Sequence, residues 1–160
     1  MPMIDVTYPE GALEDDARAK LVDDLTTSLL RAERAPDTEF FRSITWVYLH
    51  ELPAHAVNAS GKPVEEPTFR VMVTTPEGAL SDRRRAEMVE SGTAAVLEAA
   101  GLTKEDSMRV WITMREIDEG SWGAAGQVIQ FKQLVEAAKA EQENAGSGAA
   151  EVVAEPVAAG

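Results

Sequence analysis

The polar and apolar positions of the first fifty residues predict a strand, a helix and a second strand. Residues 2–8 alternate weakly between apolar and polar side chains, which is typical of a half-buried strand. Residues 14–34 place leucines at four-residue spacing and so predict a helix with one apolar face. Residues 43–52 are largely apolar on both faces. We therefore expect this second strand to lie deep in a sheet.

The same three elements are predicted again further along the chain. Residues 53–68 form a polar connector that proline and glycine interrupt. After it, the pattern predicts a strand over 69–75, a helix over 80–100 and a strand over 108–117. The glycines of residues 120–123 then predict a turn.

The end of the chain changes in character. A final short helix is predicted over 131–141. Beyond it the sequence consists mainly of Ala, Gly, Glu, Val and Ser without periodicity. Such a segment cannot bury enough apolar surface to offset the entropy lost on ordering. We therefore expect residues 1–141 to form a single domain and residues 142–160 a disordered tail.

An internal repeat links the two halves. Residues 9–13 return letter for letter as residues 76–80. Each copy closes on a tryptophan that a glutamate follows five positions later; these are Trp46 with Glu51 and Trp111 with Glu116. A repeat of this length indicates that one supersecondary unit has been duplicated.

The repeat predicts an α/β (α+β) fold made of tandem β-α-β units, over about 2–52 and 69–117. A strand, a crossover helix and a parallel strand form a right-handed unit. Two units then give a four-stranded sheet with two helices on one face. The other face carries apolar side chains and has no helix to cover it, which favours association with further copies. We expect a closed homo-oligomer, most simply a homotrimer.

Composition narrows the classes of partner. The formal net charge of −13 argues against nucleic acid, since binding phosphates needs a basic surface. An anionic substrate would need a local cluster of Arg or Lys. The chain has no cysteine and only two histidines, so we expect neither thiolate catalysis nor a metal site. No apolar run approaches the roughly 18 residues of a membrane span, and we expect a cytoplasmic protein without a membrane partner.

Pro2 is the candidate catalytic residue. The position in the second copy that matches it is Phe69, so the duplicate has no such group. Removal of Met1 would leave the proline nitrogen as a free secondary amine. A free α-amino group has a pKa of about 7.7–8.0, and burial or a nearby cation lowers that pKa. An amine of this kind suits general acid–base catalysis near neutral pH.

Several of these features together resemble the tautomerase superfamily, the relatives of 4-oxalocrotonate tautomerase. They are Pro2 directly after Met1, a Glu-Gly pair after the first strand of each unit, Arg109 at the start of the last long strand, and the Gly-Ser-Trp-Gly turn of residues 120–123. The resemblance covers about residues 2–131. The fused two-unit chain is similar to the longer branches of that superfamily, whose assembly is trimeric.

The resemblance implies a cofactor-independent tautomerase, an isomerase that uses its amino-terminal proline as the acid–base group. Its substrate would be a small enol or 2-oxo carboxylic acid. Arg109 would hold the substrate carboxylate, and Trp122 would form an apolar wall of the pocket. Arg70, which lies next to the second unit's counterpart of Pro2, is a further candidate for carboxylate binding. The resemblance implies no cofactor and no metal.

Two alternatives stay open. The fused branch also includes hydratases, dehalogenases and decarboxylases, which carry a pair of arginines after the first strand of the second unit. Residues 74–79 hold no arginine here, and residues 123–126 lack the acid that the dehalogenases use to activate water. One arginine of the simple tautomerases is also replaced, by Ala12 and Ala79. The other alternative is a trimeric binding protein that has lost catalytic activity.

Overall fold

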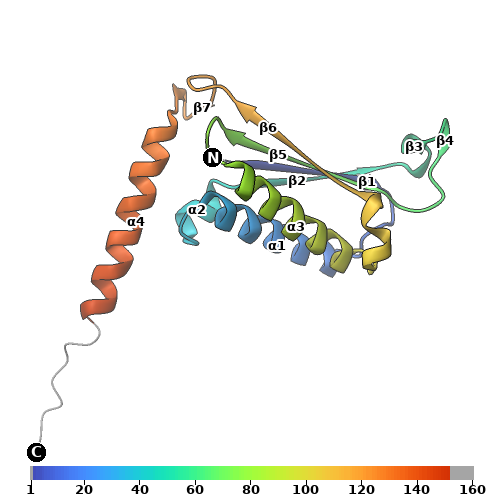
Figure 1. The fold of residues 1–160 in the computed structure, drawn as a ribbon, viewed down its shortest axis with the longest axis horizontal. Coiled ribbons are helices and arrows are strands. Elements are labelled where there is room, and N and C mark those ends of the chain that lie inside the picture. The colour runs from blue at the N-terminus through green and yellow to red at the C-terminus, as the bar shows by residue number, and fades with distance from the viewer. Residues whose placement is uncertain (1, 152–160) are drawn as a thin grey trace, which may run out of the picture.

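A four-stranded mixed sheet forms the centre of the protein (Figure 1). The structure is a computed structural model that describes residues 2–151. The strands, in their order across the sheet, are β2 (Trp46–Leu52), β1 (Met3–Pro9), β5 (Phe69–Pro76) and β6 (Val110–Ile117). β1 and β2 pair in parallel, as do β5 and β6, whereas the two central strands are antiparallel.

Two long helices cover one face of this sheet (Figure 1). α1 (Asp15–Glu33) connects β1 to β2, and α3 (Asp82–Ala99) connects β5 to β6. Each unit is therefore the β-α-β element that the repeat predicts, and the α+β fold is confirmed. Because β1 and β5 are antiparallel, the end of α1 lies near the start of α3.

Short elements connect and extend the two units. They are α2 (Glu39–Ser43), the 3₁₀ helices η1 (Ala54–Ala56) and η2 (Lys104–Arg109), the hairpins β3 (Asn58–Ala59) with β4 (Lys62–Pro63) and β7 (Gly123–Ala124) with β8 (Gln127–Val128), and α4 (Phe131–Glu151). Figure 1 shows α4 leaving the body beside the end of the sheet where β7 lies.

The core lies between the sheet and its two helices. The alternating side chains of the central strands that point toward the helices are fully buried, as Ile4 and Val71 illustrate. From the helices, Leu25 and Met88 are equally buried. Side chains on the opposite face stay accessible, so the period-two pattern of the strands separates a packed face from an open one.

The residues that repeat in the sequence make matching contacts in the two units. The Glu51 carboxylate accepts hydrogen bonds from the Gly11 backbone N–H at 3.0 Å and from the Arg18 guanidinium at 2.9 Å. Glu116 accepts the same two bonds, from the Gly78 N–H at 3.3 Å and from Arg85 at 2.9 Å. Each glutamate thus holds the turn between the first strand and the helix against the end of the second strand.

Two expectations from the sequence differ from the structure. β2 lies at the edge of the sheet, although its apolar pattern predicted a strand deep inside. Its outward row, which includes Trp46 and Tyr48, lies on the helix-free face and is exposed. In addition, α4 continues to Glu151, past the expected helix end at 141. The helix continues through Gly146 and Gly148, which are weak helix formers, and this is why the sequence predicted an earlier end. Residues 152–160 of the expected tail lie outside the described part of the chain.

Gly92 is a position of close packing between α3 and its neighbours. A Cβ atom there would lie 2.7 Å from Cδ1 of Ile112 and within 4 Å of the Met88 and Leu25 side chains. We expect Gly92→Leu to lower the free energy of unfolding by about 1–3 kcal/mol through overpacking. The matched control is Ala94→Leu, on the exposed side of the same helix, which should stay within about 0.5 kcal/mol. Urea denaturation of the two variants would test this, and equal stabilities would contradict the packing argument.

Candidate functional site

Pro2 is buried at one end of the sheet, directly before β1. Its carbonyl oxygen accepts a hydrogen bond from the backbone N–H of Trp46 at 3.2 Å, which extends the pairing of β1 with β2. The sheet register places Met3 opposite Thr74, near the end of β5. Pro2 is thus held at this end of the sheet by its bond to β2, next to the residue that pairs with β5.

Two cavities meet at Pro2. The first has a volume of about 200 Å³ and lies between the end of α1, α2 and the first turns of α4. The side chains around it are mainly apolar, and they include Pro2, Phe41, Ile44, Pro76, Phe131, Leu134 and Val135. Its charged lining residues are Glu33, Arg34 and Lys139. The end of α1, the start of α4 and the proline ring therefore enclose one largely apolar cavity that has charged residues on its wall.

The second cavity, of about 250 Å³, lies between the start of β2 and the β7–β8 hairpin. Pro2 lines it together with Trp46 and Trp122. The structure thus brings together two of the residues singled out in the sequence, Pro2 and Trp122. Their proximity follows from the sheet, because β6 ends where β1 begins and the chain reaches Trp122 directly after β6.

Glu33 is the charged residue of the first cavity with the most perturbed environment. It is the last residue of α1 and is half-buried. Burial raises the pKa of its carboxyl to about 7, while nearby positive charges, Arg84 among them, act in the opposite direction. A carboxyl whose pKa is raised in this way is suited to proton transfer near neutral pH.

Sequence reasoning did not find Glu33 or Arg84. A signal for Glu33 was present, because an acid in the last turn of a helix opposes the helix dipole. Arg84 belongs to a run of three arginines that reads as a solvated helix surface. In the structure it is half-buried, and its guanidinium donates to the Ala79 carbonyl at 3.2 Å.

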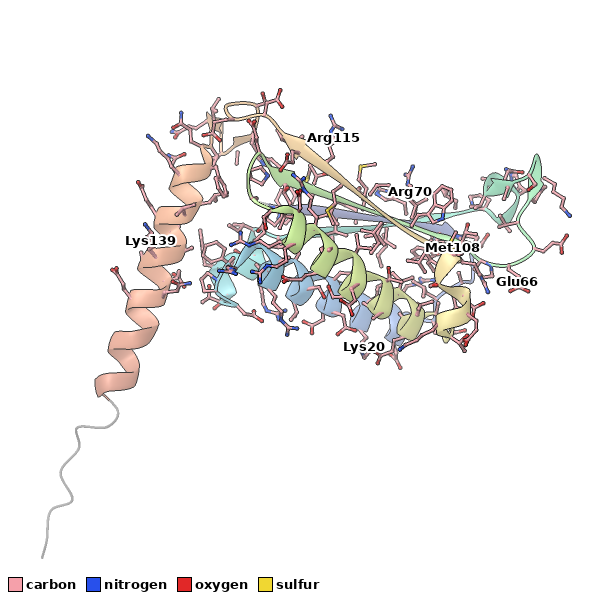
Figure 2. The ribbon with its side chains drawn as sticks, in the orientation of Figure 1. Lys20, Glu66, Arg70, Met108, Arg115 and Lys139 are labelled. Carbon is pink, nitrogen blue, oxygen red and sulfur yellow. The ribbon has the colours of Figure 1, made fainter. Side chains whose placement is uncertain are left out.

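The two arginines predicted to bind a carboxylate lie at the other end of the sheet. Arg70 pairs in register with Thr7, five residues from Pro2, which corresponds to roughly 17 Å along a strand. Figure 2 shows its side chain on the helix-free side of the sheet. It donates a hydrogen bond to the Thr7 hydroxyl at 3.2 Å.

Arg109 precedes β6 and is held by groups of its own region. Its guanidinium donates to Asp106 at 3.0 Å and to the Pro67 carbonyl at 2.8 Å, and it forms an ion pair with Glu66 at 3.3 Å. Neither Arg109 nor Arg70 can reach Pro2 of the same chain. Either could serve that proline only from another copy of the protein.

Within residues 2–151, no group of three or more His, Asp or Glu side chains is arranged to hold a metal ion. None of the helices in this described part of the chain is long and apolar enough to cross a membrane.

Comparison with known proteins gives matches among solved structures only. No family model matches the chain. No curated protein matches it either. The structure of Pt0534 inactivated by 2-oxo-3-pentynoate superposes with a TM-score of 0.68 at 20% identity, over 82% of this chain and 98% of the other.

Two further structures agree with this match. A fused 4-OT, described as a wild-type asymmetric trimer, has a TM-score of 0.66 at 19% identity, over 79% of this chain and 94% of its own. N1, a member of the cis-3-chloroacrylic acid dehalogenase family, has a TM-score of 0.66 at 20% identity, over 79% of this chain and 82% of its own. The chain therefore has the fold of the tautomerase superfamily, in the two-unit form of the fused 4-oxalocrotonate tautomerase-like proteins.

Proposed function

We propose that the protein is a tautomerase that moves a proton between oxygen and carbon of a small enol or 2-oxo carboxylic acid. The observation that supports this most directly is the place of Pro2, buried where two largely apolar cavities meet. A burial site of this kind disfavours a charged amine and lowers its pKa. General acid–base catalysis works best with such a group close to the ambient pH.

The reaction needs only proton transfer. With Met1 removed, the Pro2 nitrogen takes the proton from the enol hydroxyl, and the electron pair of that O–H bond forms the carbonyl. The carbon at the other end of the conjugated system becomes basic and receives the proton back. Trp122 excludes water from the cavity that it shares with Pro2, which strengthens the electrostatic interactions inside.

Binding of the substrate carboxylate by Arg109 or Arg70 requires a second chain. In a homotrimer, Arg109 would bind the carboxylate of a substrate that lies beside the Pro2 of a neighbouring copy. Arg70 is a further candidate for this role. The helix-free face of the sheet supports such an assembly, because Trp111 is 66% exposed and Tyr48 44% exposed on it. A fused 4-OT with the same fold is described as a trimer.

A fused-branch hydratase, dehalogenase or decarboxylase is the second candidate, since N1 belongs to the cis-3-chloroacrylic acid dehalogenase family and shares the fold. This candidate is disfavoured because residues 74–79 hold no arginine and residues 123–126 no acid. A trimeric binding protein without activity is the third. Blocked processing of Met1 would favour it, because an acylated proline nitrogen has no basicity.

Titration of the Pro2 nitrogen tests the proposal directly. Intact mass should show that Met1 is absent, and ¹⁵N NMR of proline-labelled protein should give a Pro2 pKa below about 7.7–8.0. The same preparation should convert phenylenolpyruvate or 2-hydroxymuconate to the keto form. Release of halide from a 3-haloacrylate would instead identify the second candidate. A Pro2 nitrogen that does not titrate would exclude acid–base catalysis by this residue.

A further inference from the structure

We propose that Glu33 is a second catalytic residue of this site and exchanges a proton with the substrate across the first cavity from Pro2. The inference rests on the proposed function and extends it. Glu33 and Pro2 line the same cavity of about 200 Å³. Glu33 reaches it from the end of α1, and Pro2 from the start of β1, so the two groups come from different elements that share one space.

In the part of the chain that the structure describes, the Glu33 carboxylate lacks the hydrogen bonds that give other glutamates of this protein a structural role, so it is free to exchange a proton with a ligand. The structural glutamates Glu51 and Glu116 each accept bonds from a backbone N–H and from an arginine. Within the described residues, Glu33 accepts no such hydrogen bond and forms no ion pair shorter than 4 Å. Burial raises the pKa of its carboxyl, and positive charges that include Arg84 act in the opposite direction. A half-buried carboxyl without a fixed partner can present its oxygen atoms to a ligand.

The surroundings of Glu33 contain cations and apolar groups. Arg84 of α3 acts on it electrostatically, Lys139 of α4 lines the same cavity, and Arg34 follows it in a left-handed conformation with φ of 57°. The other elements around the cavity contribute apolar side chains, namely Phe41 from α2, Ile44 directly after it, Pro76 from the end of β5 and Ala79 from the loop before α3. Burial raises the pKa of the carboxyl to about 7, although positive charges that include Arg84 lower it.

Two proton carriers fit the chemistry better than one. In ketonisation a proton leaves the enol oxygen while another joins a carbon atom some bonds away. The uncharged Pro2 amine takes the hydroxyl proton and the O–H electron pair becomes part of the carbonyl, as the protonated Glu33 carboxyl gives its proton to carbon. The Pro2 ammonium then returns its proton to the Glu33 carboxylate, so both groups regain their initial states. The free-energy change of this return is small when the pKa values of the two groups are close to each other.

Glu33→Gln tests the inference, because it keeps the shape and removes the exchangeable proton. We expect kcat for ketonisation to fall about 10²-fold at pH 7, and the limb of the pH profile that reports the carboxyl to disappear. Glu39→Gln is the matched control, an exposed acid at the start of α2 that lines neither Pro2 cavity. It should leave both kcat and the profile unchanged. Glu33→Asp keeps the carboxyl but places it one methylene group further from the cavity. This variant should keep the limb of the pH profile that reports the carboxyl, with a lower kcat than the unaltered protein.

Stability provides a readout that does not depend on activity. A carboxyl whose folded pKa is about 7 and whose ordinary pKa is 4.5 holds its proton in the folded state over a window where the unfolded state has lost it. The free energy of unfolding should therefore fall as pH rises from about 4.5 to about 7. In Glu33→Gln this fall should be absent.

The outcomes separate the inference from the function on which it rests. If Glu33→Gln keeps the wild-type kcat and pH profile while a Pro2 variant loses activity, Glu33 has no catalytic role and the proposed function stands. If the unaltered protein with a free Pro2 converts neither substrate, the proposed function fails and the inference fails with it. A loss of kcat in Glu33→Gln without any change in the pH profile would also reject proton transfer by Glu33.

Discussion

Pro2→Ala should reduce kcat/KM for ketonisation by about 10²–10⁴-fold, the usual contribution of a positioned acid–base group. Alanine still permits removal of Met1 and leaves an amine, but a primary one. The ring that fixes the direction of the lone pair is lost, and so is part of the wall that both cavities share. Steady-state kinetics with phenylenolpyruvate would measure the change.

The control for this experiment is Pro53→Ala, an exposed proline at the start of the connector. It removes the same ring far from both cavities, and its kcat/KM should equal that of the unaltered protein. Intact mass must show that Met1 is absent from every protein compared, because retained Met1 would convert the amine to an amide and abolish activity by itself. Equal rates for Pro2→Ala and the unaltered protein would remove Pro2 from the mechanism.

The fold was predictable from the sequence because its signals are local and occur twice. Alternation in the strands and leucine spacing in the first helix define each unit, and the repeat of residues 9–13 shows that there are two. The structure also explains why Glu51 and Glu116 recur, since each fixes the same turn. The order of the strands could not be predicted in this way, because no local pattern indicates which strand lies at the edge of the sheet. The sequence therefore predicted a central position for β2, which lies at the edge.

The candidate site was predictable only in part, for a related reason. Pro2 and Trp122 were found from a resemblance, and the structure places them at one cavity. Glu33 and Arg84 are brought together by the antiparallel pairing of β1 with β5, a contact between the two units that no local pattern encodes. The wall that α4 supplies was also missed, because its apolar side chains predict a helix but not where that helix packs.

Trp111→Asp should convert the proposed trimer into a monomer. Trp111 lies on the helix-free face of β6 and is 66% exposed in the single chain. In an assembly through this face, the aspartate would place an unpaired charge in a buried interface at a cost of several kcal/mol. Sedimentation equilibrium should then give a mass near the 17.3 kDa of one chain in place of about three times that value. Val89→Asp introduces the same charge at an exposed apolar residue on the outer side of α3 and should leave the mass unchanged.

Activity of the monomeric variant would show which arginine serves Pro2. Trp111 lines neither Pro2 cavity, so its replacement leaves the proline, Glu33 and Trp122 in place. If Arg109 of a neighbouring copy holds the substrate carboxylate, separation of the chains should raise KM by about 10-fold or more, since a charge-assisted hydrogen bond contributes about 1.5–3 kcal/mol. Arg109→Ala in the assembled protein should raise KM to a similar extent, and the two changes should not add. A monomer that kept its KM would mean that cations of the same chain hold the carboxylate, and Arg34 and Lys139 are those that line the cavity beside Pro2.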